Sequence, residues 1–138
     1  MTTNQKSLVK ETFAKVVPIA DTAAGLFYGR LFEMDPSLRP LFKNDLSEQG
    51  KKLMQMIGYC VGNLDGLDEL VPAVKELGRK HAGYGVEEED YATVGGALLW
   101  TLEQGLGAAF TPEVKAAWMA VYELLAATML EGAKSVAA

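Results

Sequence analysis

His81 is the only histidine in the 138-residue chain, and near neutral pH an imidazole can act as an acid, a base or a metal ligand. The chain has one cysteine, Cys60, so no cysteine cluster with zinc spacing can form. A Ser–His–Asp triad would have only sequence-distant candidates and no nucleophile motif. One histidine also cannot supply the paired Glu-x-x-His motifs of di-iron bundles. A metal bound by His81 must therefore arrive with most of its ligands attached.

Haem meets this condition, because the porphyrin supplies four nitrogens and the protein adds only one axial donor. With an ordinary pKa of about 6.5, an imidazole is mostly neutral at pH 7 and is a good donor to iron. An apolar slot between helices would bury the macrocycle. The local stretch "ELGRKHAGYGV", residues 76–86, by itself favours a surface histidine beside a helix end. The local sequence alone leaves both interpretations open.

The segments that must position His81 are helices. Residues 66–82 form an amphipathic segment closed by Gly83 and Gly85. Five more segments show apolar residues at helical spacing: Val9, Phe13, Val16 and Val17; Ala24, Phe27, Tyr28, Leu31 and Phe32; Leu53, Met56, Ile57 and Cys60; Tyr91, Val94, Leu98, Leu102 and Leu106; Trp118, Val121, Tyr122, Leu125 and Met129. No strand alternation, repeat or linker interrupts them. We therefore expect an all-α protein of six or seven helices in a single domain, residues 1–138.

Prolines and small polar residues mark the expected helix ends. Pro18 predicts a turn or the start of a second helix, and Pro36 opens a short helical turn that Pro40 limits. Ser47 is the expected N-cap of the helix that follows. In "FTPEV", Thr111 is the expected N-cap of the last helix, with a proline at the first helical position.

Bulk composition narrows the setting. The net charge of −5 and pI near 4.9 argue against nucleic acid or an anionic membrane as the main partner. The N-terminus lacks an apolar run typical of a secretion signal, and no window approaches the ~20 apolar residues of a membrane span. One cysteine excludes an intrachain disulfide and is compatible with a reducing compartment. We expect a cytoplasmic protein.

The stretch "LGRKHAGYGV…YATVGGALLWTLEQGLGAAFTPEVKAAWMAVYELLA" resembles the proximal half of a globin, particularly of the bacterial single-domain and flavohaemoglobin-related branch. The upstream half agrees, with Tyr28, then Pro36, then Phe42, then Gln49 and Leu53 four positions apart. The resemblance extends from about residue 5 to 131, and its specificity lies in the joint spacing. It implies a globin fold with a short or absent D helix and a pocket for haem b, iron protoporphyrin IX.

The resemblance implies a role for each matching residue on the proximal side. His81 would be the iron ligand, with its second ring nitrogen bonded to the carbonyl of Leu77. The remaining expected haem contacts are Phe42, Leu77, Val86, Tyr91 and Val94, and the candidate partners of the haem propionates are Lys52, Lys80 and Tyr84.

On the distal side, Tyr28 and Gln49 match the tyrosine–glutamine pair of many bacterial globins, with Leu53 as apolar neighbour. Hydrogen bonds to charged acceptors contribute roughly 1.5–3 kcal/mol each. At about 1.4 kcal/mol per decade, two of them would slow O2 release on the order of a hundredfold. We therefore expect high O2 affinity at pentacoordinate iron. Gln49 pointing outward and an internal sixth ligand, Tyr28 or Lys52, are the alternatives.

Departures from the flavohaemoglobin pattern bear on function. That branch pairs its proximal histidine with a tyrosine, matched by Tyr91, and with a glutamate on the last helix, whose place is taken by Ala133. Glu131 is two positions early, about 200° around a helix, and is expected to face elsewhere. The chain ends at Ala138, which would leave no room for an attached reductase.

Three functions follow. The first is reversible binding of O2, or of NO and CO, for storage, delivery or scavenging, by a monomer or weak homodimer. The second is NO dioxygenation with a separate reductase. The third is a haem-free helical module that signals through partners; retention of His81, Phe42 and the Tyr28–Gln49 pair counts against it. Gas sensing is disfavoured, because no output domain is attached.

Overall fold

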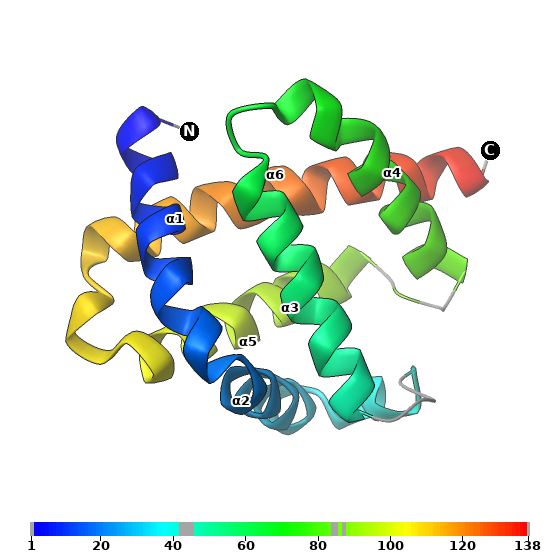
Figure 1. The fold of residues 1–138 in the computed structure, drawn as a ribbon. Coiled ribbons are helices and arrows are strands. Elements are labelled where there is room, and N and C mark those ends of the chain that lie inside the picture. Colours follow the sequence, from blue (N-terminus) through cyan, green and yellow to red (C-terminus); the bar gives the residue numbers. More distant parts are fainter. Residues whose placement is uncertain (1, 42–45, 84–85, 87, 138) are drawn as a thin grey trace.

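In the computed structural model, which describes residues 2–41, 46–83, 86 and 88–137, the described chain is helical and contains no β-strand (Figure 1). The elements, in chain order, are α1 (Thr3–Val16), η1 (Val17–Ile19), α2 (Ala20–Met34), η2 (Pro36–Leu41), α3 (Leu46–Gly62), α4 (Leu67–Gly83), α5 (Glu88–Leu106), η3 (Gly107–Ala109) and α6 (Pro112–Ala137). The η elements are short 3-10 helices. The all-α prediction is confirmed.

Most helix ends agree with the residues that mark them. Pro36 opens η2, and Pro18 lies in η1. The Thr111 hydroxyl accepts a hydrogen bond from the Val114 N–H at 3.2 Å, as expected of an N-cap. Val17, which the apolar spacing assigned to the first helix, is 53% exposed because α1 ends one residue earlier and η1 turns the chain.

The prediction that Ser47 caps α3 is wrong. The helix already begins at Leu46, so Ser47 lies inside its first turn with an exposed side chain. Asn44 and Asp45 precede this helix, and each satisfies the composition expected of a cap as well as Ser47 does, so composition alone could not select the first helical residue.

The largest buried cluster joins α1, the C-terminal half of α3, α5 and the N-terminal half of α6. Its buried members are Val9, Val16, Ala23, Val61, Leu64, Leu102, Val114, Ala117, Trp118 and Val121. The indole N–H of Trp118 donates to the Thr12 hydroxyl at 2.9 Å, which satisfies a polar group inside this apolar region. This cluster is the main stabilising core.

A second cluster holds α2 against η2 and α5, and contains Phe27, Tyr28, Leu31, Leu38 and Ala97. Here α3 crosses α2 closely at Gly50: a Cβ placed on Gly50 would lie 2.8 Å from the Cβ of Ala24. The crossing brings the N-terminal end of α3 beside Tyr28.

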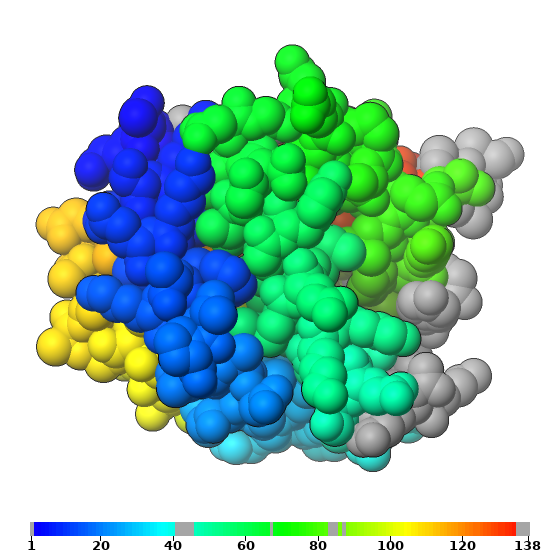
Figure 2. All heavy atoms as spheres, in the orientation of Figure 1, coloured from blue at the N-terminus to red at the C-terminus, as the bar shows by residue number. Residues whose placement is uncertain are grey.

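The third cluster lies where α4 packs on the C-terminal half of α6, the most extensive helix pair of the described chain (Figure 1). It contains Cys60, Leu70 and Val74, with Leu125 and Met129 packed against them. Cys60 comes from the C-terminal end of α3, a helix that otherwise packs on α1 and α2. The space-filling view shows the surface hollowed between α3 and α4 (Figure 2). Across the residues described, no helix is long and apolar enough to cross a membrane.

Candidate functional site

His81 lies in the last turn of α4, half-buried, and its ring is tied to its own helix. Its Nδ1 is 2.8 Å from the main-chain carbonyl oxygen of Leu77, one turn earlier. A carbonyl can only accept, so Nδ1 carries the proton and the lone pair of the neutral ring is on Nε2. The hydrogen bond thus fixes both the ring orientation and the tautomer that a metal would require.

The surroundings of His81 favour its neutral form. Burial lowers the pKa of His81 below its ordinary value, and the hydrogen bond to Leu77 partly opposes this effect. A neutral imidazole is the form that coordinates metal. Val86, the first described residue after α4, is held nearby, because its N–H donates to the His81 carbonyl at 3.1 Å.

Tyr28 and Gln49 are brought together by the close crossing of α2 and α3. The Tyr28 hydroxyl donates to the main-chain carbonyl of Gln49 at 3.3 Å, and the Gln49 side chain also hydrogen-bonds the phenol. Phe27 meets the Tyr28 ring edge-on at 5.1 Å, and Phe32 stacks on it at 6.1 Å. The phenol is therefore fixed at its ring and at its oxygen.

The Tyr28 phenol remains protonated over the physiological range. Burial raises the pKa of Tyr28 to about 12, and the hydrogen bond with the Gln49 side chain partly opposes this rise. A phenol that keeps its proton can donate a hydrogen bond. The Tyr28–Gln49 pair therefore offers donor groups to a polar ligand on this side of the molecule.

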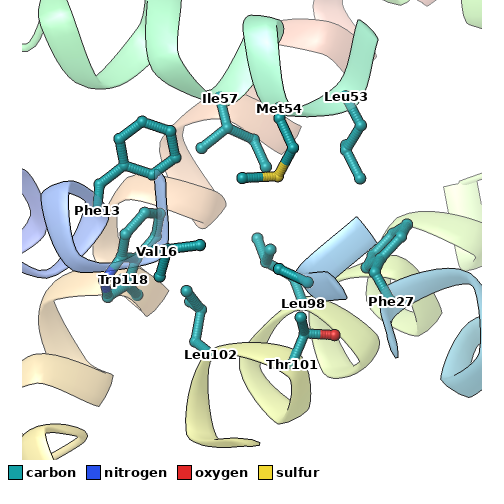
Figure 3. A pocket seen from close by; sticks show the side chains of 11 residues that line it. Phe13, Val16, Phe27, Leu53, Met54, Ile57, Leu98, Thr101, Leu102 and Trp118 are labelled. Carbon is teal, nitrogen blue, oxygen red and sulfur yellow. The ribbon is translucent and has the colours of Figure 1, made fainter. Parts of the chain in front are cut away.

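Leu53 and Val94 pack against the cluster that contains Tyr28, so the structure groups these three predicted site residues. Beside them lies a cavity of about 20 Å³ in which side chains of α3 face those of α5, with Phe27 and Trp118 toward its two ends (Figure 3). The lining also includes Leu53, Met54 and Leu98. The cavity is far too small for a tetrapyrrole, which must therefore be accommodated elsewhere.

A flat apolar cofactor would need partly exposed apolar side chains to lie against. Four apolar residues expected to touch the macrocycle are all half-buried, each retaining some exposed surface: Leu53, Leu77, Val86 and Val94. Within the described residues, no group of three or more His, Cys, Asp or Glu side chains could hold a metal ion. These residues therefore fit a metal that carries its own equatorial ligands and takes one nitrogen from His81.

The remaining predicted site residues are placed as follows. Phe42 and Tyr84 lie outside the described residues. Lys52 and Lys80 are exposed. Tyr91 is buried, and its carbonyl accepts a hydrogen bond from the hydroxyl of Tyr122, a residue that packs on α5.

The acidic residue nearest the expected proximal glutamate points away. Glu131 lies 3.8 Å from Lys75, and two thirds of its side chain is exposed. Position 133 is a half-buried alanine. The proximal side therefore presents the Leu77 carbonyl to His81 and has no carboxylate at position 133.

Three glycines that shape the site were missed by the sequence analysis: Gly50 at the α2–α3 crossing, and Gly78 and Gly132 at the α4–α6 crossing. Each lies inside a helix, where glycine costs about 1 kcal/mol relative to alanine. That cost is the signal that could have identified them, because a glycine kept in a helix interior often marks a close approach.

Three comparisons with known proteins agree with this geometry. The globin family model matches residues 25–129. A neuroglobin of Dissostichus mawsoni is 35% identical over 121 residues, which are 78% of this chain and 76% of the relative. A flavohemoprotein of Bacillus subtilis is 32% identical over 124 residues, which are 86% of this chain but 31% of the relative.

Solved structures show the same fold. A hexacoordinated heme protein from an anhydrobiotic tardigrade superimposes with a TM-score of 0.88 at 19% identity, covering 97% of this chain and 96% of that one. A bacterial globin from Campylobacter jejuni gives 0.85 at 24% identity, covering 98% of each chain. On the strength of the family match and the sequence relatives, this chain belongs to the globin family, whose members bind haem.

Proposed function

We propose that residues 1–138 form one globin domain that holds haem b through His81 and binds O2 reversibly beside Tyr28 and Gln49. The observation that carries this proposal is the hydrogen bond from His81 Nδ1 to the Leu77 carbonyl. It directs the lone pair of Nε2 outward from a ring whose burial keeps it neutral. When bound, haem would supply an iron able to take a diatomic ligand, and His81 would be the residue that holds it.

Apolar contact and one nitrogen bond account for how the chain would hold the cofactor. Leu77 and Val86 would contact the proximal face, and Leu53 and Val94 the distal side and the rim. A covalent thioether link to Cys60 is disfavoured, since this thiol is buried among Leu70 and Val74. This argument supports non-covalent haem b.

Tyr28 and Gln49 would control how long the ligand stays. Their side chains supply an O–H and an N–H donor, and a ligand with partial negative charge accepts from both. Tyr28 also donates to the Gln49 carbonyl, so the loss of that hydrogen bond offsets part of the free energy gained by donating to a ligand. We propose slow O2 release, suited to storage, delivery or scavenging.

We further propose that the resting ferrous iron is pentacoordinate. His81 is the only histidine, so one chain cannot provide the second imidazole of a bis-histidyl site. The burial that raises the pKa of Tyr28 to about 12 also disfavours the phenolate that would bind iron. Lys52, the other candidate sixth ligand, is exposed.

NO dioxygenation with a separate reductase is the alternative, prompted by the similarity to a flavohemoprotein. The proximal side does not favour it. The ion pair between Glu131 and Lys75, and the alanine at position 133, remove the carboxylate expected to increase electron density on the iron.

Haem reconstitution of a His81→Gly variant tests the proposed function. We expect the unmodified protein to show a Soret band and a ferrous spectrum that responds to O2. His81→Gly should lose that spectrum and regain it with added imidazole. Arg79→Gly, an exposed change on the same turn of α4, controls for the helix cost of glycine. A His81→Gly protein with the original spectrum, in the absence of imidazole, would refute the assignment.

A further inference from the structure

The helix that carries His81 touches α6 backbone to backbone, at two buried glycines. A Cβ on Gly78 of α4 would lie 1.9 Å from the carbonyl oxygen of Met129 in α6. A Cβ on Gly132 of α6 would lie 1.9 Å from the carbonyl oxygen of Lys75 in α4. Both distances are far below the 3.0 Å that real Cβ contacts respect, so only glycine fits either position.

The two contacts are reciprocal. On each helix, the glycine lies three residues from the carbonyl that the other helix's glycine would obstruct, on neighbouring turns of one face. Every other glycine at a helix–helix contact meets side-chain atoms, and Gly25, Gly29 and Gly62 meet nothing within 4 Å. Among the described glycines, the close approach of two main chains is therefore specific to the α4–α6 crossing.

This crossing is connected to the His81 ring by short, stiff links. Gly78 follows Leu77, whose carbonyl accepts the hydrogen bond from His81 Nδ1 at 2.8 Å. The ring is thus tied to the α4 main chain within one turn of the point where that main chain meets α6. No flexible side chain separates the two contacts.

Other interactions at the crossing are weaker determinants of its geometry. The ion pair between Lys75 and Glu131 spans 3.8 Å between side chains that are each about half or more exposed, and such pairs contribute little. Val74 and Leu70 fill the adjoining apolar region, which can repack. Main-chain atoms in contact cannot repack, so the glycines fix how closely α4 approaches α6.

We propose that Gly78 and Gly132 are positioning residues that set where the His81 imidazole stands in the pocket, and thereby the strength of its bond to iron. The proposal rests on the proposed function, in which His81 is the axial ligand. It assigns to the α4–α6 crossing a role in ligand binding in addition to its role in stability.

Alanine at each glycine provides the test. We build Gly78→Ala, Gly132→Ala and the double variant on a background of Gly25→Ala and Gly29→Ala, two exposed positions where alanine favours the helix. Unfolding by urea and the iron–histidine stretching frequency of the ferrous protein, from resonance Raman spectra, are the two readouts. We expect both single variants to lower the urea midpoint and to shift the frequency in the same direction. The double variant should shift it by less than the sum, because one displacement of α4 relieves both clashes.

A matched variant separates positioning from packing. Val74→Ala removes buried atoms from the same helix pair, at a residue 2% exposed, without forcing the main chains apart. We expect it to lower the urea midpoint and to leave the frequency unchanged. If one glycine variant does not fold, the other decides, since both open the same crossing.

The outcomes distinguish this proposal from the proposed function. A frequency unchanged in the alanine variants, while their urea midpoints fall, would overturn the positioning role and leave His81 as ligand. Absence of an iron–histidine band in the background protein itself would overturn the proposed function. Even then, the fall in urea midpoint of the double variant can be compared with the sum of the falls of the two single variants. A fall smaller than the sum would show that the two glycines share one contact.

Discussion

A neutral imidazole binds a metal through the ring nitrogen that carries no proton, so a hydrogen bond that holds the proton on the other nitrogen prepares it as a ligand. In His81 this bond is made within the helix, to the carbonyl of Leu77 at 2.8 Å. Many metal-bound histidines use a carboxylate for this purpose, which raises the basicity of the ring. A neutral carbonyl does so less. In the proposed site, an iron bound by His81 would therefore receive less electron density than one in a site with a proximal glutamate, in line with the proposed reversible binding.

Replacing Tyr28 with phenylalanine should accelerate O2 release. The loss of one hydrogen bond to a partly charged ligand, roughly 1.5–3 kcal/mol, corresponds to about ten- to a hundredfold. Because the Gln49 carbonyl, 3.3 Å away, competes with the ligand for the phenol O–H, we expect an acceleration near the lower end of that range. Stopped-flow displacement of O2 by CO measures the rate. Tyr122→Phe is the control, because it also removes a phenol hydroxyl, but one that donates to the Tyr91 carbonyl. Equal rates for Tyr28→Phe and the parent would exclude the phenol as the controlling donor.

Cys60 should make the fold sensitive to alkali. Burial raises the pKa of Cys60 from 9.0 to about 11, so the unfolded chain loses this proton at lower pH than the folded one. Stability is therefore complete below pH 9 and falls as the pH rises toward 11, by about 2 kcal/mol from this group. Urea unfolding of the parent and Cys60→Ala at pH 8 and pH 11 isolates the effect, because all other titrating groups are shared. The free energy of unfolding of the parent minus that of Cys60→Ala should be smaller at pH 11 than at pH 8. The same value at both pH values would contradict this prediction.

At the scale of helices, Thr12 joins α1 to α6. Its hydroxyl donates to the Leu8 carbonyl at 2.7 Å and accepts from the Trp118 indole N–H at 2.9 Å, in a region where both residues are buried. Thr12→Val keeps the shape and leaves the indole N–H unsatisfied, which should cost about 1–3 kcal/mol of unfolding free energy. Thr12→Ser, which keeps the hydroxyl, should cost less. Urea denaturation measures both, and an equal cost for the two variants would mean that packing outweighs the hydrogen bond.

Helix positions were predictable where local chemistry decides them. The apolar spacing located the six long helices, and the Thr111 cap is confirmed by its bond to the Val114 N–H. Ser47 shows the limit, because Asn44 and Asp45 precede α3 and are N-cap residue types as well. Val17 shows another: it continues the apolar spacing of α1, but the helix ends before it.

The arrangement of the site was less predictable, since it depends on contacts between distant segments. Its uniqueness identified His81 as a candidate, the resemblance to globins added Tyr28 and Gln49, and the roles of all three stay proposals. Two features arise only when helices meet: the bond from Tyr28 to the Gln49 main chain, and the glycine contacts of α4 with α6. Nothing local to Gly78 or Gly132 reveals which main chain each will meet.

At the scale of the whole molecule, the chain divides its stabilising core from its pocket. The largest cluster joins α1, the end of α3 and the start of α6 around Trp118. The hollow lies between the other half of α3 and the end of α4, which pack on α2 and α6 respectively (Figures 1 and 2). We therefore expect the core to form without the cofactor, and the segments beside the hollow to be the less stable part of the chain.

This division predicts where haem stabilises the chain. A ligand that binds only the folded state protects the segments that open without it. Without haem, amide hydrogens of residues 46–53 and 77–83 should exchange markedly faster than those of residues 9–16 and 114–121. Adding haem should slow exchange in the first two segments and leave the last two nearly unchanged, as measured by mass spectrometry of proteolytic peptides. His81→Gly with haem is the control, since weaker attachment should protect α4 less than α3. Uniform protection of all four segments would mean that core and pocket fold as one unit, and that the Trp118 cluster depends on the cofactor after all.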